Sequence, residues 1–112
     1  MREFGPPEVM GLEEIATPVP GPGEVLIRVH AVSVNRTLDL AVRAGTYPAP
    51  AKLPHILGVD PSGVVTAVGE GVTARTVGDR VATRQLLRPP TETSGPMILG
   101  VHAWGGYAES VK

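Results

Sequence analysis

The sequence has no cysteine and few aromatic residues. One tryptophan, one phenylalanine and two tyrosines occur among 112 residues. The absence of cysteine excludes disulfides, iron–sulfur clusters, thiolate nucleophiles and every zinc site that uses a cysteine ligand. Neither sign of charge predominates, because ten basic and eleven acidic residues give a net charge of −1. We therefore expect neither nucleic acid nor an anionic membrane surface as a partner.

Long hydrophobic runs are absent as well. No window approaches the ~18 apolar residues of a membrane span, and residues 1–7 lack the apolar stretch of a secretion signal. We therefore predict a cytoplasmic protein. Glycine (14) and proline (12) are abundant while 42% of residues are hydrophobic, which favours short strands joined by turns over disorder. The length suits one domain with one core.

The clearest strand is predicted for residues 24–34, where apolar side chains alternate. Val25, Ile27, Val29 and Ala31 share one face of it. Asn35 then stands where a helix N-cap belongs, and Gly45 stands where a C′ glycine belongs. The intervening pattern predicts a helix of about two turns over residues 37–44.

Further along the chain, proline at 48, 50 and 54 predicts an extended surface loop around Tyr47. Two strands are predicted within residues 63–83, joined by a turn that contains Asp79 and Arg80. Asp60 is predicted to pair with Arg80 or to support a backbone turn. These elements sum to six or seven short strands and one short helix, so the predicted fold class is mostly β, a partly open barrel.

Three motifs occur in a characteristic order along the chain. They are Pro22-Gly23-Glu24-Val25-Leu26-Ile27-Arg28-Val29; Leu57-Gly58-Val59-Asp60-Pro61-Ser62-Gly63-Val64-Val65 through Val77-Gly78-Asp79-Arg80-Val81; and Gly105-Gly106-Tyr107-Ala108-Glu109. In this order they resemble the N-terminal substrate domain of medium-chain dehydrogenases/reductases. That GroES-like β-barrel domain is shared by zinc alcohol dehydrogenases and zinc-free quinone oxidoreductases, and the resemblance covers nearly all of the chain.

The family's second domain has no counterpart in this sequence. Family members bind NAD(P)H on a Rossmann sheet with a glycine-rich turn, and no such turn follows a strand here. We expect residues 1–112 to form the GroES-like domain alone, incomplete at both ends. Without its nucleotide domain this chain is expected to be inactive.

Two positions separate the branches of the family. The zinc branch carries Cys-x-x-Asp at the strand-to-helix junction and Gly-His-Glu before the Gly-Val-Val strand, whereas this chain has Asn35-Arg36-Thr37-Leu38-Asp39 and Gly58-Val59-Asp60. Asparagine and valine are poor zinc ligands, so the resemblance implies the zinc-independent quinone oxidoreductase branch. That branch spaces its residues Asn-x-x-Asp, and this chain has one extra residue.

The resemblance implies hydride transfer from NADPH to a quinone or enone, although NADH is not distinguished from NADPH. Asn35 is a candidate for a hydrogen bond to the substrate carbonyl or the nicotinamide ribose, and equally for a helix cap. Tyr47 is expected either to wall the substrate pocket or only to pack on the proline loop. His55 is a candidate cleft residue, with a structural role as the alternative. We assign no catalytic residue and no metal ligand in this domain.

Two other functions stay open at this point. One is a noncatalytic GroES-like module or a subunit that docks on a separate Rossmann partner. The other is a zinc alcohol dehydrogenase, which the missing ligands disfavour. An unpaired domain would expose apolar surface, so we expect self-association or pairing with a Rossmann domain.

Overall fold

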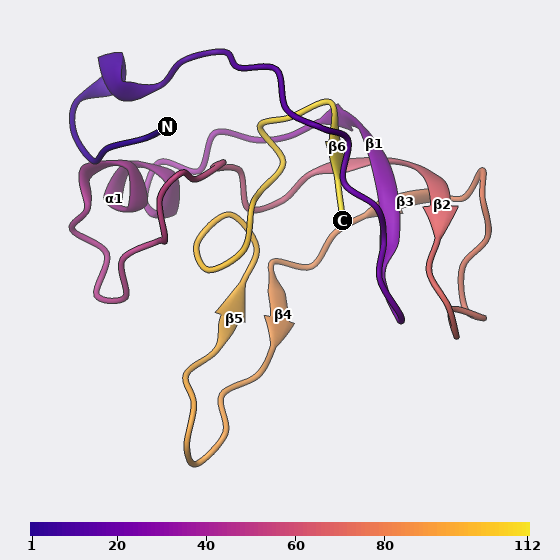
Figure 1. The fold of residues 1–112 in the computed structure, drawn as a ribbon. Helices are drawn as coiled ribbons and strands as arrows, with labels where there is room; N and C mark the ends of the chain where they lie inside the picture. The colour runs from indigo at the N-terminus through magenta and orange to yellow at the C-terminus, as the bar shows by residue number, and fades with distance from the viewer.

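The computed structural model describes residues 1–112, and its regular elements are short (Figure 1). They are η1 (Pro7–Val9), β1 (Val25–Ala31), α1 (Leu38–Ala44), β2 (Ser62–Val68), β3 (Arg80–Ala82), β4 (Leu86–Arg88), β5 (Met97–Ile98) and β6 (Ser110–Val111). Neither helix has the length and apolar character needed to cross a bilayer. The predicted mostly β architecture with one short α-helix is confirmed.

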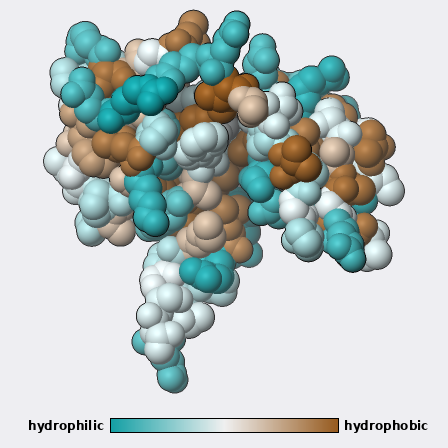
Figure 2. Space-filling model, viewed as in Figure 1, coloured by the Kyte–Doolittle hydropathy of each residue, from teal (hydrophilic) through white to brown (hydrophobic).

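The body of the domain is a four-stranded antiparallel sheet in the order β3-β2-β1-β6. β1 pairs with β2 along its length, from Val25 opposite Val68 to Ala31 opposite Ser62, with irregularities in register at two points. β4 and β5 form a separate two-stranded ribbon that projects from the body (Figures 1 and 2). The four-stranded sheet does not close on itself, so the barrel is open, and these 112 residues contain no Rossmann sheet.

Two clusters of buried apolar side chains hold the fold together. One lies between α1 and the loops and consists of Val42, Ala51, Leu57, Val59 and Val101. The other lies on the sheet and consists of Ile27, Leu99 and Val111.

The predicted apolar face of β1 is confirmed for Val25, Ile27 and Val29, which pack in the second cluster. Ala31, predicted on the same face, is exposed beyond an irregularity in register. Leu26 is only 9% exposed. Neighbouring strand residues point to opposite faces, so the start of β1 is covered on both sides.

The predicted helix is confirmed as α1, which covers the end of the domain remote from β3 (Figure 1). Its buried apolar residue is Val42, and Leu38 packs against the same cluster. Gly45 ends the helix with a φ of 72°, and its N–H donates to the carbonyls of Ala41 and Val42. This left-handed C′ conformation is the one that the sequence predicted for Gly45.

Candidate functional site

A buried carboxylate organises the region where β1 leads into α1. Asp39 is 3% exposed, and its Oδ2 accepts hydrogen bonds from the Asn35 N–H at 2.7 Å and from the Tyr107 hydroxyl at 2.8 Å. Its Oδ1 accepts from the Gly58 N–H at 3.2 Å. These contacts tie the start of α1 to two segments that are distant in sequence. We refer to Asn35, Asp39, Gly58 and Tyr107 as the Asp39 network.

The geometry of Gly58 and the protonation of Tyr107 both fit this arrangement. Gly58 has a φ of 98°, and a Cβ at this position would lie 2.7 Å from the Tyr107 ring. Only glycine therefore suits the site. Burial and the neighbouring Asp39 carboxylate raise the pKa of Tyr107 well above its usual range, so the hydroxyl remains a neutral donor to Asp39.

Asn35 caps the helix with one end of its side chain. Its Oδ1 accepts hydrogen bonds from the N–H groups of Thr37 at 3.1 Å and Leu38 at 2.9 Å. The predicted capping role is thus confirmed, although regular helix begins only at Leu38. The extra residue between Asn35 and Asp39 is absorbed by a turn at Arg36 and Thr37.

The other end of the Asn35 side chain remains available. Because Oδ1 faces two backbone donors, the Nδ2 amino group must point the opposite way. It has no acceptor within the protein, and no side-chain polar atom without a partner is buried in this structure. The Asn35 Nδ2 is therefore a solvent-accessible hydrogen-bond donor with a fixed orientation. Such a group can bind a carbonyl oxygen.

Asp60 supports the same loop from the other side. Its carboxylate accepts hydrogen bonds from the Ser33 N–H at 3.2 Å and the Ser33 hydroxyl at 2.6 Å. Of the two roles predicted for Asp60, pairing with Arg80 is wrong, because no ion pair joins them and Asp60 bonds to Ser33 instead. The alternative, support of the backbone, agrees with the hydrogen bond from the Ser33 N–H. Asp79 does act as a turn residue, accepting hydrogen bonds from the Thr76 N–H and hydroxyl.

Tyr47 follows α1 and packs on the first hydrophobic cluster. Its ring meets the ring of His102 edge-on, with 6.3 Å between centroids. The Tyr47 hydroxyl has no hydrogen-bond partner in the protein and is not buried. Contact of Tyr47 with a substrate stays a prediction.

His55 lies in the interior. It is 3% exposed, and its Nε2 lies 3.0 Å from the Gly100 carbonyl oxygen. The N-terminal ammonium of Met1 donates to the His55 carbonyl at 2.8 Å. Burial lowers the pKa of His55, so the ring is neutral and donates to Gly100. A role for His55 in substrate contact stays a prediction.

Neither of the two main cavities is lined by all three predicted site residues. A groove of about 580 Å³ runs between the N-terminal segment and residues 104–110, and its lining includes His55 and Tyr107 but neither Asn35 nor Tyr47. Sequence reasoning missed the roles of Asp39 and Tyr107 in this region. Both belong to motifs that the sequence displays, but their contact spans 68 residues and leaves no local signal.

The carboxylate oxygens near Asn35 are not available as ligands for a zinc ion. Zinc is held by thiolate, imidazole or carboxylate ligands, and nowhere in residues 1–112 do three His, Cys, Asp or Glu residues gather. Both oxygens of Asp39 already accept hydrogen bonds from the protein, and those of Asp60 are bonded to Ser33. The residues present therefore do not fit a catalytic zinc site.

The chain belongs to the alcohol dehydrogenase GroES-like domain family, whose model matches residues 21–112. It is 46% identical over 108 residues to the quinone oxidoreductases of Sus scrofa and of Homo sapiens, which covers 96% of this chain and 28% of each relative. The chain thus spans about a quarter of the length of these curated relatives. These similarities confirm the predicted membership of the medium-chain dehydrogenase/reductase superfamily.

Solved structures confirm the fold. An NAD-dependent alcohol dehydrogenase superposes with a TM-score of 0.89 at 41% identity, covering 99% of this chain and 35% of that one. A cobalt- and zinc-bound thermostable alcohol dehydrogenase from Pyrobaculum aerophilum gives a TM-score of 0.84 at 40% identity, covering 96% and 36%. The quinone oxidoreductase of Pseudomonas syringae gives 0.74 at 37% identity, covering 97% and 28%. The same fold therefore occurs in a metal-bound alcohol dehydrogenase and in a quinone oxidoreductase.

Proposed function

We propose that this chain is the substrate-binding domain of a zinc-independent, NADPH-dependent quinone or enone oxidoreductase. The observation that carries the proposal is the exposed Asn35 Nδ2, fixed in orientation by the helix cap. The side chains around Asn35 are poor ligands for zinc. The chain is also 46% identical to quinone oxidoreductases. A hydrogen bond from Nδ2 would polarise a quinone or enone carbonyl and favour hydride addition.

The nucleotide would be held by a Rossmann domain, because these residues contain no phosphate-binding turn. NADPH supplies the hydride when bound. The role of this chain is to bind and orient the carbonyl and to keep water away from it. We therefore expect no oxidation of NADPH by the 112-residue chain alone, and turnover by this chain would contradict that part of the proposal.

We also propose that the surface next to Asn35 takes part in pairing with the nucleotide domain or with a second copy. Val34, adjacent to Asn35, is 76% exposed, and Leu40 on α1 is 41% exposed. Exposed apolar side chains close in sequence to Asn35 would fit a surface that a partner covers. Placing the pairing surface here would also exclude water from the carbonyl.

Titration of the chain with 9,10-phenanthrenequinone, followed by ¹H–¹⁵N NMR, tests the binding role. Phenanthrene is the control ligand, because it has the same ring system but no carbonyl group to accept a hydrogen bond. Asn35→Asp keeps an oxygen for the two capping bonds and removes the N–H donor. Loss of one hydrogen bond of ~1 to 1.5 kcal/mol predicts a five- to tenfold weaker Kd for the quinone in this variant.

The controls separate capping from binding. Asn35→Ser also caps the helix and lacks the amide, so it should weaken quinone binding while leaving helix content unchanged. Phenanthrene binding should not respond to either variant. Equal affinity of wild type and Asn35→Asp for the quinone would contradict the assignment of Asn35, and stoichiometric zinc in purified protein would contradict zinc independence.

A further inference from the structure

We propose that Tyr107 is a positioning residue for carbonyl binding, because its hydroxyl fixes the chain on both sides of Asn35. The inference rests on the proposed function and concerns the same site. The Tyr107 hydroxyl lies 2.8 Å from Asp39 Oδ2 and 3.3 Å from the Ser33 carbonyl oxygen. One hydroxyl therefore contacts an acceptor that precedes Asn35 in the chain and another that follows it.

The contact that follows Asn35 runs through the Asp39 carboxylate. The Tyr107 hydroxyl and the Asn35 N–H both donate to the same oxygen, Oδ2, the second of them at 2.7 Å. The other oxygen accepts from the Gly58 N–H at 3.2 Å. Hydrogen bonds to a carboxylate are stronger than those between neutral groups, and Asp39 is buried. Tyr107 therefore helps to hold the oxygen that holds the Asn35 backbone.

The contact that precedes Asn35 is at Ser33. The N–H and hydroxyl of Ser33 donate to Asp60 at 3.2 Å and 2.6 Å, while its carbonyl oxygen faces the Tyr107 hydroxyl. A hydroxyl has only one hydrogen to donate, so the longer contact with Ser33 is the weaker of the two. Only Val34 separates this anchored residue from Asn35.

The direction of the Asn35 Nδ2 group depends on the backbone as well as on the side chain. The side chain is fixed relative to the first turn of α1, because its Oδ1 accepts from the N–H groups of Thr37 and Leu38. The capped turn could still tilt as a unit if the chain entering it were free. A hydrogen bond weakens steeply as its donor angle falls toward about 120°, so such a tilt would weaken carbonyl binding. Tyr107 opposes it.

Replacement of Tyr107 by phenylalanine isolates the hydroxyl. The ring packs against the first hydrophobic cluster, and phenylalanine keeps that ring. Asp39 keeps its hydrogen bonds from the N–H groups of Asn35 and Gly58. We therefore expect the variant to fold, with circular dichroism equal to that of wild type.

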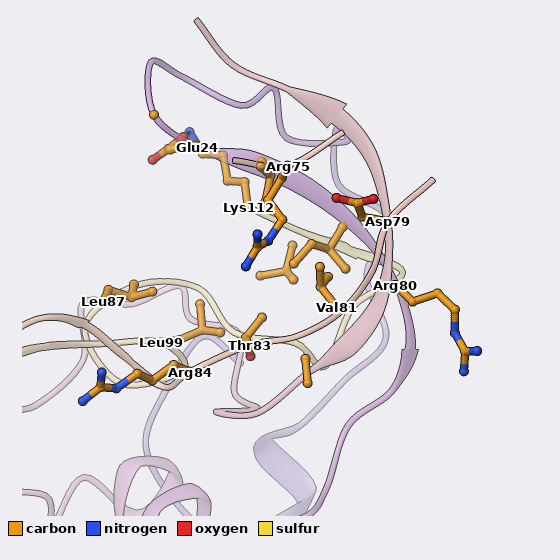
Figure 3. Close-up of a pocket in the computed structure, with 15 residues that line it drawn as sticks. Glu24, Arg75, Asp79, Arg80, Val81, Thr83, Arg84, Leu87, Leu99 and Lys112 are labelled. Carbon is orange, nitrogen blue, oxygen red and sulfur yellow. Dashed lines mark ion pairs between the residues drawn. The ribbon is translucent and has the colours of Figure 1, made fainter. Parts of the chain in front are cut away.

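Thr83→Val is the matched control. The Thr83 hydroxyl also donates to one acceptor, the Pro61 carbonyl oxygen, at 2.9 Å. Thr83 lines the cavity of about 720 Å³ drawn in Figure 3, where none of Asn35, Asp39 and Tyr107 lies. Each variant thus removes one hydroxyl donor, but only Tyr107→Phe removes one that is linked to Asn35.

Titration of the full 112-residue chain with 9,10-phenanthrenequinone and with phenanthrene, followed by ¹H–¹⁵N NMR, measures the effect. We expect Tyr107→Phe to bind the quinone about three- to fivefold more weakly than wild type, and phenanthrene within about twofold of wild type. Thr83→Val should leave both affinities within about twofold. In an Asn35→Ser background, which lacks the amide, adding Tyr107→Phe should change quinone affinity by less than about 1.5-fold, because Tyr107 acts through Asn35.

Three outcomes would overturn the inference. They are a quinone affinity of Tyr107→Phe equal to that of wild type, an equal loss of phenanthrene affinity, and the same weakening in the Asn35→Ser background as in wild type. Backbone ¹⁵N relaxation of the wild-type chain gives a test that requires no variant. Order parameters near about 0.85 are expected for residues 33–35, and values below about 0.6 would contradict a fixed loop.

Failure of this inference can be distinguished from failure of the proposed function. If Asn35→Asp binds the quinone as tightly as wild type, Asn35 is not the carbonyl donor and both proposals are overturned. If Asn35→Asp weakens quinone binding and Tyr107→Phe does not, the proposed function stands and only the positioning role of Tyr107 is overturned.

Discussion

Replacement of Asp39 by asparagine tests whether the Asp39 network holds the domain together. The change preserves the shape of the side chain and removes its charge. Three donors surround the carboxylate, namely the N–H groups of Asn35 and Gly58 and the hydroxyl of Tyr107. An ionised aspartate accepts from all three, whereas an asparagine amide offers one acceptor oxygen and two donors.

The size of the effect follows from this count of donors. Suppose that the amide oxygen of the new asparagine still accepts the hydrogen bonds from the Asn35 N–H and the Tyr107 hydroxyl. Its NH₂ group then faces the Gly58 N–H, which loses its acceptor. A buried donor without an acceptor costs ~1 to 3 kcal/mol. The two remaining hydrogen bonds weaken by roughly 0.5 to 1 kcal/mol each, because their acceptor is no longer charged. Removal of a buried charge offsets about 1 kcal/mol or more of this loss. We expect the free energy of unfolding of Asp39→Asn to fall by about 2 to 3 kcal/mol.

Urea unfolding followed by circular dichroism measures this change, and the corresponding fall in Tm is roughly 10 to 20 °C. The matched control is Asp60→Asn, because Asp60 is exposed and accepts only from Ser33. It should lose less than about 1 kcal/mol. If Asp39→Asn unfolds within about 0.5 kcal/mol of wild type, the carboxylate does not organise this region and the reasoning is refuted.

Two further predictions concern the buried His55 and the close approach of β1 and β2 at Gly63. Because burial lowers the pKa of His55, its contribution to stability is complete above its unfolded pKa of ~6.5 and declines as pH falls through the lower folded value. His55→Gln should therefore flatten the loss of stability as pH falls below about 6.5. Parallel slopes for His55→Gln and wild type would argue against this. Gly63→Ala should cost about 1 to 3 kcal/mol, because its Cβ would clash with the Arg28 carbonyl oxygen. Gly11→Ala meets no neighbouring atom, and equal urea midpoints for the two variants would contradict the close approach of β1 and β2.

Local signals in the sequence were sufficient for β1 and α1, but not for η1 or for the ribbon of β4 and β5. Alternation of apolar residues predicted β1, and the pair of Asn35 and Gly45 predicted both ends of α1. The helix ends depend on contacts between residues a few positions apart. The alternation in β1 records which side chains are buried, although the partner strand β2 lies more than 30 residues further along the chain.

The contacts around the candidate site depend on strand register and were less accessible. Ala31 lies opposite Ser62, so continuing the antiparallel register by two residues places Ser33 opposite Asp60. The sequence alone suggested either Arg80 or a backbone turn as the partner of Asp60. In the structure Asp60 instead accepts two hydrogen bonds from Ser33. Knowledge of the register would have been enough to find them.

Burial of isolated polar residues was harder still to predict. Nothing near His55 in sequence indicates that its ring reaches Gly100, 45 residues away. The link between Asp39 and Tyr107 likewise joins segments that only the folded chain brings together. Motif resemblance drew attention to these stretches without showing which side chains meet.

The helix cap at Asn35 has a consequence for the energetics of recognition. Rotation of its amide by 180° would place an NH₂ group against the N–H groups of Thr37 and Leu38, so the side chain is held in one rotamer before any ligand arrives. Ordering a mobile side chain on binding typically opposes association by ~0.5 to 1.5 kcal/mol. Asn35 has already lost that freedom during folding. A carbonyl compound would therefore meet a preorganised donor, and affinity gained there would depend on the folding of the first turn of α1.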